Sequence, residues 1–171
     1  MPIVALLLIF FFMAGCSKDD DDIKTFNLDL RMPFPVSVIT VVDSIIELRT
    51  FEFETSIEDV LIANNSSKDK LKKAVLDFLD LEILFPASAH FDFLKDIELY
   101  MDGPGLEPDI FGFFYDIPKD QRKMLSLEVL DKSAHRYLRQ DKIQLILKLK
   151  LREPMTEDLV IRANSRFIGG T

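Results

Sequence analysis

The stretch that decides the fold is Lys142–Arg152, which reads K-I-Q-L-I-L-K-L-K-L-R. Every odd-numbered position in it is aliphatic: Ile143, Leu145, Leu147, Leu149 and Leu151. Its even-numbered positions are polar or basic, except for Ile146. When a pattern repeats every two residues, alternate side chains lie on opposite faces of a β-strand. The stretch therefore predicts a strand with one face in the core and the other towards solvent.

The same period recurs along most of the chain. Residues 159–167 alternate in the same way after Pro154 and a short acidic loop, so we expect a C-terminal hairpin with 142–152. Near the N-terminus the apolar members of 26–32 share one predicted face, and Pro33 with Pro35 indicates an edge or a change of strand. Further strands are predicted at 36–42 (covered on both sides), 45–54 (with a bulge), 79–85, 97–101, 110–115 and 124–129.

Helices are expected only as short insertions. Ser56-Ile57-Glu58-Asp59 is a variant capping box, and a second short helix is predicted from Ser66 through Val75, with the lysines at 68, 70, 72 and 73 on its solvated side. Residues 131–140 predict one or two helical turns with three inward side chains: Ala134, Tyr137 and Leu138. Residues 23–171 thus predict a single domain, an antiparallel β-sandwich of about eight strands with one or two short inserted helices.

Composition excludes several classes of protein. The 171 residues carry a formal net charge of −8, a single cysteine and two histidines. One cysteine allows neither an internal disulfide nor a four-cysteine zinc site. The acidic balance argues against nucleic acid as a partner, because phosphate binding requires a basic face.

The N-terminus begins with an apolar run at residues 3–13, I-V-A-L-L-L-I-F-F-F-M, followed by Ala14, Gly15 and Cys16. Eleven helical residues reach about 17 Å, well short of a bilayer core of about 30 Å. The length fits the apolar centre of a secretory signal. No Lys or Arg precedes the run, so either the α-amino group supplies the positive charge or the true start lies upstream.

Met13-Ala14-Gly15-Cys16 resembles the lipobox of bacterial lipoproteins. The resemblance implies that residues 1–15 are a signal peptide, that cleavage falls between Gly15 and Cys16, and that Cys16 becomes acylated. Residues 16–22 would then be the lipidated cysteine and an acidic tether. Ser17 and the residues after it resemble the export signal of Bacteroidota lipoproteins, which implies a place on the outer face of the outer membrane; the signal residues are Lys18, Asp19, Asp20, Asp21 and Asp22.

The remaining domain is only loosely similar to known proteins. Its order of strands and short helices resembles small immunoglobulin-like or late-embryogenesis-abundant-like sandwiches, and other small Bacteroidota surface lipoproteins. This resemblance transfers no functional residue. With the −3 of residues 17–22 subtracted from −8, residues 23–171 carry −5.

No catalytic motif is present. We find no Gly-x-Ser-x-Gly elbow, no P-loop and no dinucleotide fingerprint, so we predict a protein that is not an enzyme and has no cofactor. A metal site combining His90 and Asp92 with His135 and Asp131 is conceivable, but ordinary surface histidines are the simpler interpretation.

The loop 101–109, M-D-G-P-G-L-E-P-D, is the most distinctive irregular segment. Its carboxylates predict a possible ligand loop: Asp102, Glu107 and Asp109. Two alternatives are a calcium site and a pair of carboxylates for glycoside hydrolysis. The phenylalanines at 111, 113 and 114 adjoin the loop, and core packing is favoured for them over an exposed aromatic platform.

The last two predicted strands carry a basic outer stripe: Lys142, Lys148, Lys150, Arg152, Arg162 and Arg166. It could bind an anionic partner, although a solvated face that protects a sheet edge is the simpler interpretation. Together these features predict a lipid-anchored surface lipoprotein that contacts the membrane through its anchor and binds a ligand or partner, such as a surface glycan or an outer-membrane protein. The alternatives are an accessory component of an outer-membrane or filament assembly and a carboxylate-dependent glycan hydrolase.

Overall fold

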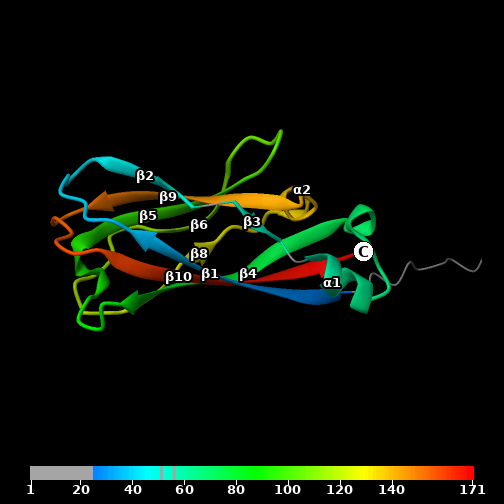
Figure 1. Cartoon of the computed structure of the whole chain (residues 1–171), viewed down its shortest axis with the longest axis horizontal. Helices are drawn as coiled ribbons and strands as arrows, with labels where there is room; N and C mark the ends of the chain where they lie inside the picture. Colours follow the sequence, from blue (N-terminus) through cyan, green and yellow to red (C-terminus); the bar gives the residue numbers. More distant parts are fainter. Residues whose placement is uncertain (1–24, 51, 56) are drawn as a thin grey trace, which may run out of the picture.

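A computed structural model describes residues 25–50, 52–55 and 57–171. The predicted signal peptide, the predicted lipidation site Cys16 and the predicted tether lie outside these residues, as does Ser56 of the predicted capping box. The described chain is mainly β and forms two antiparallel sheets packed face to face (Figure 1). The antiparallel sandwich predicted from the sequence is therefore confirmed.

The four-stranded sheet contains, in spatial order, β1 (Thr25–Val36), β10 (Leu159–Gly170), β4 (Lys73–Phe85) and β7 (Met124–Ser126). The six-stranded sheet contains β2 (Ile45–Arg49), β9 (Lys142–Leu151), β5 (Leu94–Asp102), β6 (Asp109–Phe114) and β8 (Glu128–Val129), with β3 (Phe53–Glu54) also paired to β9. The described residues thus form ten strands, against about eight predicted, partly because 45–54 is divided into β2 and β3.

The helical segments are short. They are α1 (Ile57–Ala63), α2 (His135–Leu138) and the 3₁₀ turns η1 (Lys68–Lys70) and η2 (Phe91–Phe93). The three inward side chains predicted for 131–140 are all buried. Of the second helix predicted from Ser66 through Val75, only the single turn η1 forms. The rest of the prediction is wrong, because Lys72 N–H donates to Gly170 O and β4 begins at Lys73. Among the described residues, no helix is long and apolar enough to cross a membrane.

The alternation of 142–152 is reproduced in β9. All five odd-numbered aliphatic side chains are buried in the core between the sheets. In β1 the prediction also holds, and the strand continues through Pro33 and Pro35 as far as Val36. β1 is an edge strand, where a residue without an N–H is tolerated.

The predicted C-terminal hairpin is wrong. β9 belongs to the six-stranded sheet and β10 to the four-stranded sheet, so the loop between them crosses from one layer to the other. Alternation shows that each strand has one buried face, but it does not show which sheet the strand joins. The basic stripe predicted across the two strands is therefore divided between opposite outer faces of the sandwich.

The strand predicted at 36–42 is also absent, because β1 ends at Val36 and the following residues form a loop with one bridge between Ile39 and Met155. Val41 is 54% exposed there, so this apolar segment is not covered on both sides. The two described ends of the chain lie together at the opposite end of the sandwich, where Thr25 pairs with Gly170 (Figure 1).

Candidate functional site

The outer face of the six-stranded sheet brings together polar and aromatic residues from separate strands. In the register of β5 and β9, Asp96 pairs with Lys150, Glu98 with Lys148, and Asp102 with Gln144. These side chains alternate with the buried residues of each strand, so they share the face that points away from the core.

Glu98 is the centre of a small network on this face. Its Oε2 accepts a hydrogen bond from the Tyr100 hydroxyl at 2.8 Å, and its Oε1 accepts one from the Tyr115 hydroxyl at 2.6 Å. The Phe113 and Tyr115 rings stack with centroids 4.9 Å apart. One carboxylate thus holds the hydroxyls of Tyr100 and Tyr115, and the Tyr115 ring also stacks on Phe113.

The same network changes the acidity of the tyrosines. Burial, followed by the hydrogen bond to Glu98 and its negative charge, raises the pKa of Tyr100 to about 12. For Tyr115 the hydrogen bond to Glu98 is the largest cause and burial the second, and the pKa again rises to about 12. Both phenols are therefore neutral near pH 7 and keep donating to Glu98.

A hollow of about 370 Å³ lies beside Tyr115, and we call it the tyrosine groove. Its lining includes Ile45, Asp96, Glu98, Tyr115 and Lys148. Ile45 is 74% exposed and Tyr115 is 48% exposed, so apolar surface is open to a ligand here.

The cations of the tyrosine groove are available to a ligand. Lys148 Nζ lies 4.2 Å from the centroid of the Tyr100 ring. Neither Lys148 nor Lys150 forms an ion pair within the described part of the chain. The groove thus combines an aromatic ring, an aliphatic side chain, carboxylates and free ammonium groups.

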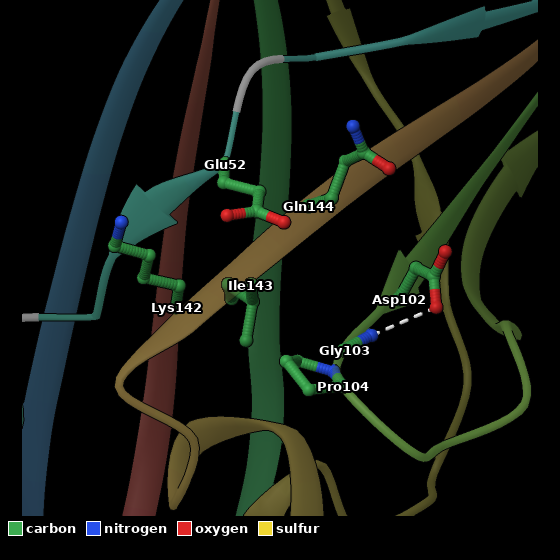
Figure 2. A pocket seen from close by; sticks show the side chains of 7 residues that line it. All are labelled: Glu52, Asp102, Gly103, Pro104, Lys142, Ile143 and Gln144. Atoms are coloured by element: carbon green, nitrogen blue, oxygen red, sulfur yellow. Dashed lines mark hydrogen bonds between the residues drawn. The ribbon is translucent and has the colours of Figure 1, made fainter.

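Figure 2 shows a second hollow of about 300 Å³, which we call the Asp102 groove. It includes Lys142 and Gln144 of β9, whereas the tyrosine groove includes Lys148 and Lys150. It includes the start of the predicted ligand loop, at Asp102, Gly103 and Pro104. Asp102 Oδ2 lies 2.9 Å from Arg49 Nη1, and its Oδ1 accepts the Gly103 N–H at 2.8 Å. Of the three predicted carboxylates, only Asp102 lines this groove.

The other two residues of the predicted loop make their contacts elsewhere, Asp109 through its carboxylate and Glu107 through its backbone. Asp109 Oδ1 lies 2.6 Å from Lys132 Nζ, and the backbone carbonyl of Glu107 accepts the Tyr137 hydroxyl at 2.6 Å. Gly105 has a φ of 72°, a conformation that favours glycine, so this segment is a turn built for its backbone geometry. The structure therefore does not gather the three carboxylates into one site.

The conceivable histidine site is not formed either. His90 Nδ1 lies 3.3 Å from Asp92 Oδ2, whereas His135 Nδ1 lies 2.9 Å from Ser133 Oγ in another part of the fold. Burial and the nearby Arg139 and Arg136 lower the pKa of His135. Among the described residues, no three His, Cys, Asp or Glu side chains are grouped so as to hold a metal ion.

The phenylalanines after the loop divide between core and surface. Phe111 is fully buried and meets Tyr137 edge-on at 5.5 Å, as core packing predicts. Phe113 is only half-buried and supports Tyr115 on the outer face. The sequence interpretation missed this aromatic pair, and its signal was the spacing of Phe113 and Tyr115, two residues apart on one face of the predicted strand.

Comparisons with known proteins add little. No protein-family model and no curated protein matches the sequence. A solved structure of turnip yellow mosaic virus at 100 K is similar over 84% of this chain and 93% of that chain, with 14% sequence identity and a TM-score of 0.29. A similarity this weak carries no argument about function.

Proposed function

We propose that this chain is a lipid-anchored lipoprotein of the outer-membrane surface whose β-sandwich binds a carbohydrate without transforming it. The observation that carries the binding role is the tyrosine groove. A sugar ring has C–H groups on its faces and hydroxyls around its rim. An aromatic ring next to carboxylates and ammonium groups complements both features.

The arrangement favours binding over hydrolysis. Glycoside hydrolysis requires two carboxyl groups placed across one bond, one of them held protonated. Glu98 is engaged by two tyrosine hydroxyls, and Asp102 by Arg49 and a backbone N–H. Side chains held in this way on strands are suited to orient a ligand.

The anchor rests on the sequence resemblance of residues 13–22. Stable membrane attachment requires two or more acyl chains, which a modified Cys16 would supply. The domain then needs no membrane-binding face of its own, and both outer sheet faces are free for other contacts.

The binding role is tested with the full chain in detergent and a panel of neutral gluco-, xylo- and manno-oligosaccharides. We expect at least one to bind, and Tyr115→Ala to weaken that binding about tenfold, since it removes the exposed ring. Phe85→Ala is the matched control, because Phe85 is 64% exposed but lies on β4 of the other sheet. If no oligosaccharide binds, the carbohydrate proposal is wrong.

The anchor is tested in cells. Cys16→Ala should leave the protein without lipid, as seen by metabolic labelling with a fatty acid. Replacement of Asp19–Asp22 by alanine should keep the lipid but protect the protein when intact cells are treated with protease. Resistance of the wild-type protein to the same treatment, under conditions that digest a known surface protein, would contradict the surface location.

A further inference from the structure

The two grooves lie on one face and in one line. Along β9 the tyrosine groove includes Lys148 and Lys150, and the Asp102 groove includes Lys142 and Gln144. These four residues alternate with buried ones, so they share the outer face. The distance from Lys150 to Gln144, six residues along a strand, is about 20 Å.

The Asp102 groove supplies polar groups and no aromatic ring. Glu52 and Asp102 approach it from opposite sides of β9 (Figure 2). The Glu52 carboxylate and the Lys142 ammonium form no hydrogen bond or ion pair within the described residues. Gln144 Nε2 donates to Thr50 O, which leaves the Gln144 Oε1 free to accept. Donors and acceptors are therefore available to hydroxyl groups.

Arg49 lies between the two grooves, although it lines neither of them. It pairs in register with Ile146 of β9, and its guanidinium lies 2.7 Å from Glu47 Oε1 and 2.9 Å from Asp102 Oδ2. The ion pair to Asp102 therefore runs from β2 across β9 to β5. Ile146 beneath this region is only 1% exposed, although it stands on the outer side of the strand. Between the grooves the face therefore presents a flat guanidinium that two carboxylates hold in place.

We infer that the two grooves are two subsites of one extended site, which takes a linear oligosaccharide laid along β9. This inference rests on the proposed function and names the form of its ligand. One sugar unit stacks at Tyr115 in the tyrosine groove. A unit further along the same chain hydrogen-bonds to Glu52 and Gln144 in the Asp102 groove, after passing Arg49.

The inference makes ligand length decisive. A mono- or disaccharide is too short to reach both subsites across about 20 Å of strand. A longer chain engages the second subsite at a high effective concentration, because the first is already occupied. Affinity should therefore rise with length and then level off once both grooves are filled.

The extended site is tested by calorimetry of the full chain. The ligands are a size series of the best-binding oligosaccharide, from disaccharide to octasaccharide. Glu52→Ala should weaken binding of the octasaccharide about tenfold, since a hydrogen bond to a charged group is lost, and leave the disaccharide unchanged. Tyr115→Ala should weaken both. Glu54→Ala is the matched control, because Glu54 is exposed and lies two residues away but lines neither groove.

The outcomes separate the two proposals. Equal affinity for short and long chains, or an equal loss for both lengths in Glu52→Ala, overturns the extended site and leaves the single tyrosine groove. Absence of binding at every length overturns both. A folded Glu52→Ala variant is verified by its circular dichroism spectrum, and Glu52→Gln, which keeps the shape, should lose less affinity than Glu52→Ala.

Discussion

The two outer faces of the sandwich use charge in different ways. On the four-stranded sheet the arginines of β10 are paired across strands: Arg162 with Glu82 of β4 at 2.5 Å, and Arg166 with Asp29 of β1 at 2.7 Å. Arg166 also lies over the Phe78 ring at 5.3 Å. Both arginines of β10 are thus paired within the sheet, and we call this the closed face.

On the six-stranded sheet the lysines of β9 are not neutralised in this way. Lys148 and Lys150 stand opposite Glu98 and Asp96 in the register, yet none of these pairs is close enough to be an ion pair. Glu98 instead accepts two tyrosine hydroxyls. We call this the open face, because its lysines form no ion pair within the described residues. The comparison shows that strands with the same alternation can pair their charges or leave them unpaired, depending on the side chains of the neighbouring strands.

The largest effect is expected from a change in the core that both sheets share. Phe111→Ala should lower the free energy of unfolding by about 3–5 kcal/mol, because a fully buried aromatic ring leaves a cavity. Urea denaturation followed by circular dichroism measures it. Phe111→Leu fills part of the cavity and should cost less; a loss below about 1 kcal/mol for the alanine variant would contradict the packing described here.

A smaller effect concerns the open face alone. Glu98→Gln removes the negative charge that both hydroxyls meet, so the pKa of Tyr100 and of Tyr115 should fall from about 12 towards the ordinary 10.0. Ultraviolet absorbance during an alkaline titration reports phenolate formation. Tyr137 is the internal reference, because burial is the main cause of its raised pKa and Glu98 is not among the causes.

The same tyrosines make stability depend on alkaline pH. Their pKa is raised in the folded protein, so their contribution is complete below pH 10 and is lost as the pH rises through about 12. We expect the wild-type protein to lose stability over this interval more steeply than Glu98→Gln. Urea midpoints measured across the interval test the difference, and parallel curves for the two proteins would count against it.

The smallest effects come from a matched pair of single changes. Arg162→Gln on the closed face should cost about 0.5–1 kcal/mol of stability, typical of a surface ion pair, without changing carbohydrate affinity. Lys148→Gln on the open face should change stability by less than about 0.5 kcal/mol and weaken carbohydrate binding severalfold. Thermal unfolding and calorimetry measure the two quantities. A reversed pattern would mean that the faces have been assigned the wrong way round.

Much of the fold could be predicted from the sequence. The period of two in 142–152 and in 26–32 reports burial on one face, and burial is what the sandwich core imposes. The apolar stretch 36–42 misled because β-branched residues also occur in exposed loops, as Val41 shows. The hairpin of β9 and β10 misled because the choice of sheet depends on long-range contacts that no local pattern contains.

Less of the site could be predicted. Asp102 was singled out and does line a groove, but as part of a turn and an ion pair with Arg49. Tyr115 and Glu98 were missed, and Lys148 was placed only in a basic stripe, because the three residues lie on different segments of the chain. Only the pairing of β5 with β6 and β9 brings them together, and strand pairing is a tertiary property.

The pairing of Thr25 with Gly170 determines how the molecule responds to mechanical load. β1 is paired with β10 along all its twelve residues, and its first residue stands at the end of the sandwich where the N-terminal segment enters. With the proposed anchor at Cys16, flow or a bound polymer that drags on the domain pulls β1 along its own axis. The hydrogen bonds between β1 and β10 are then loaded in shear and share the force, instead of breaking one after another from one end.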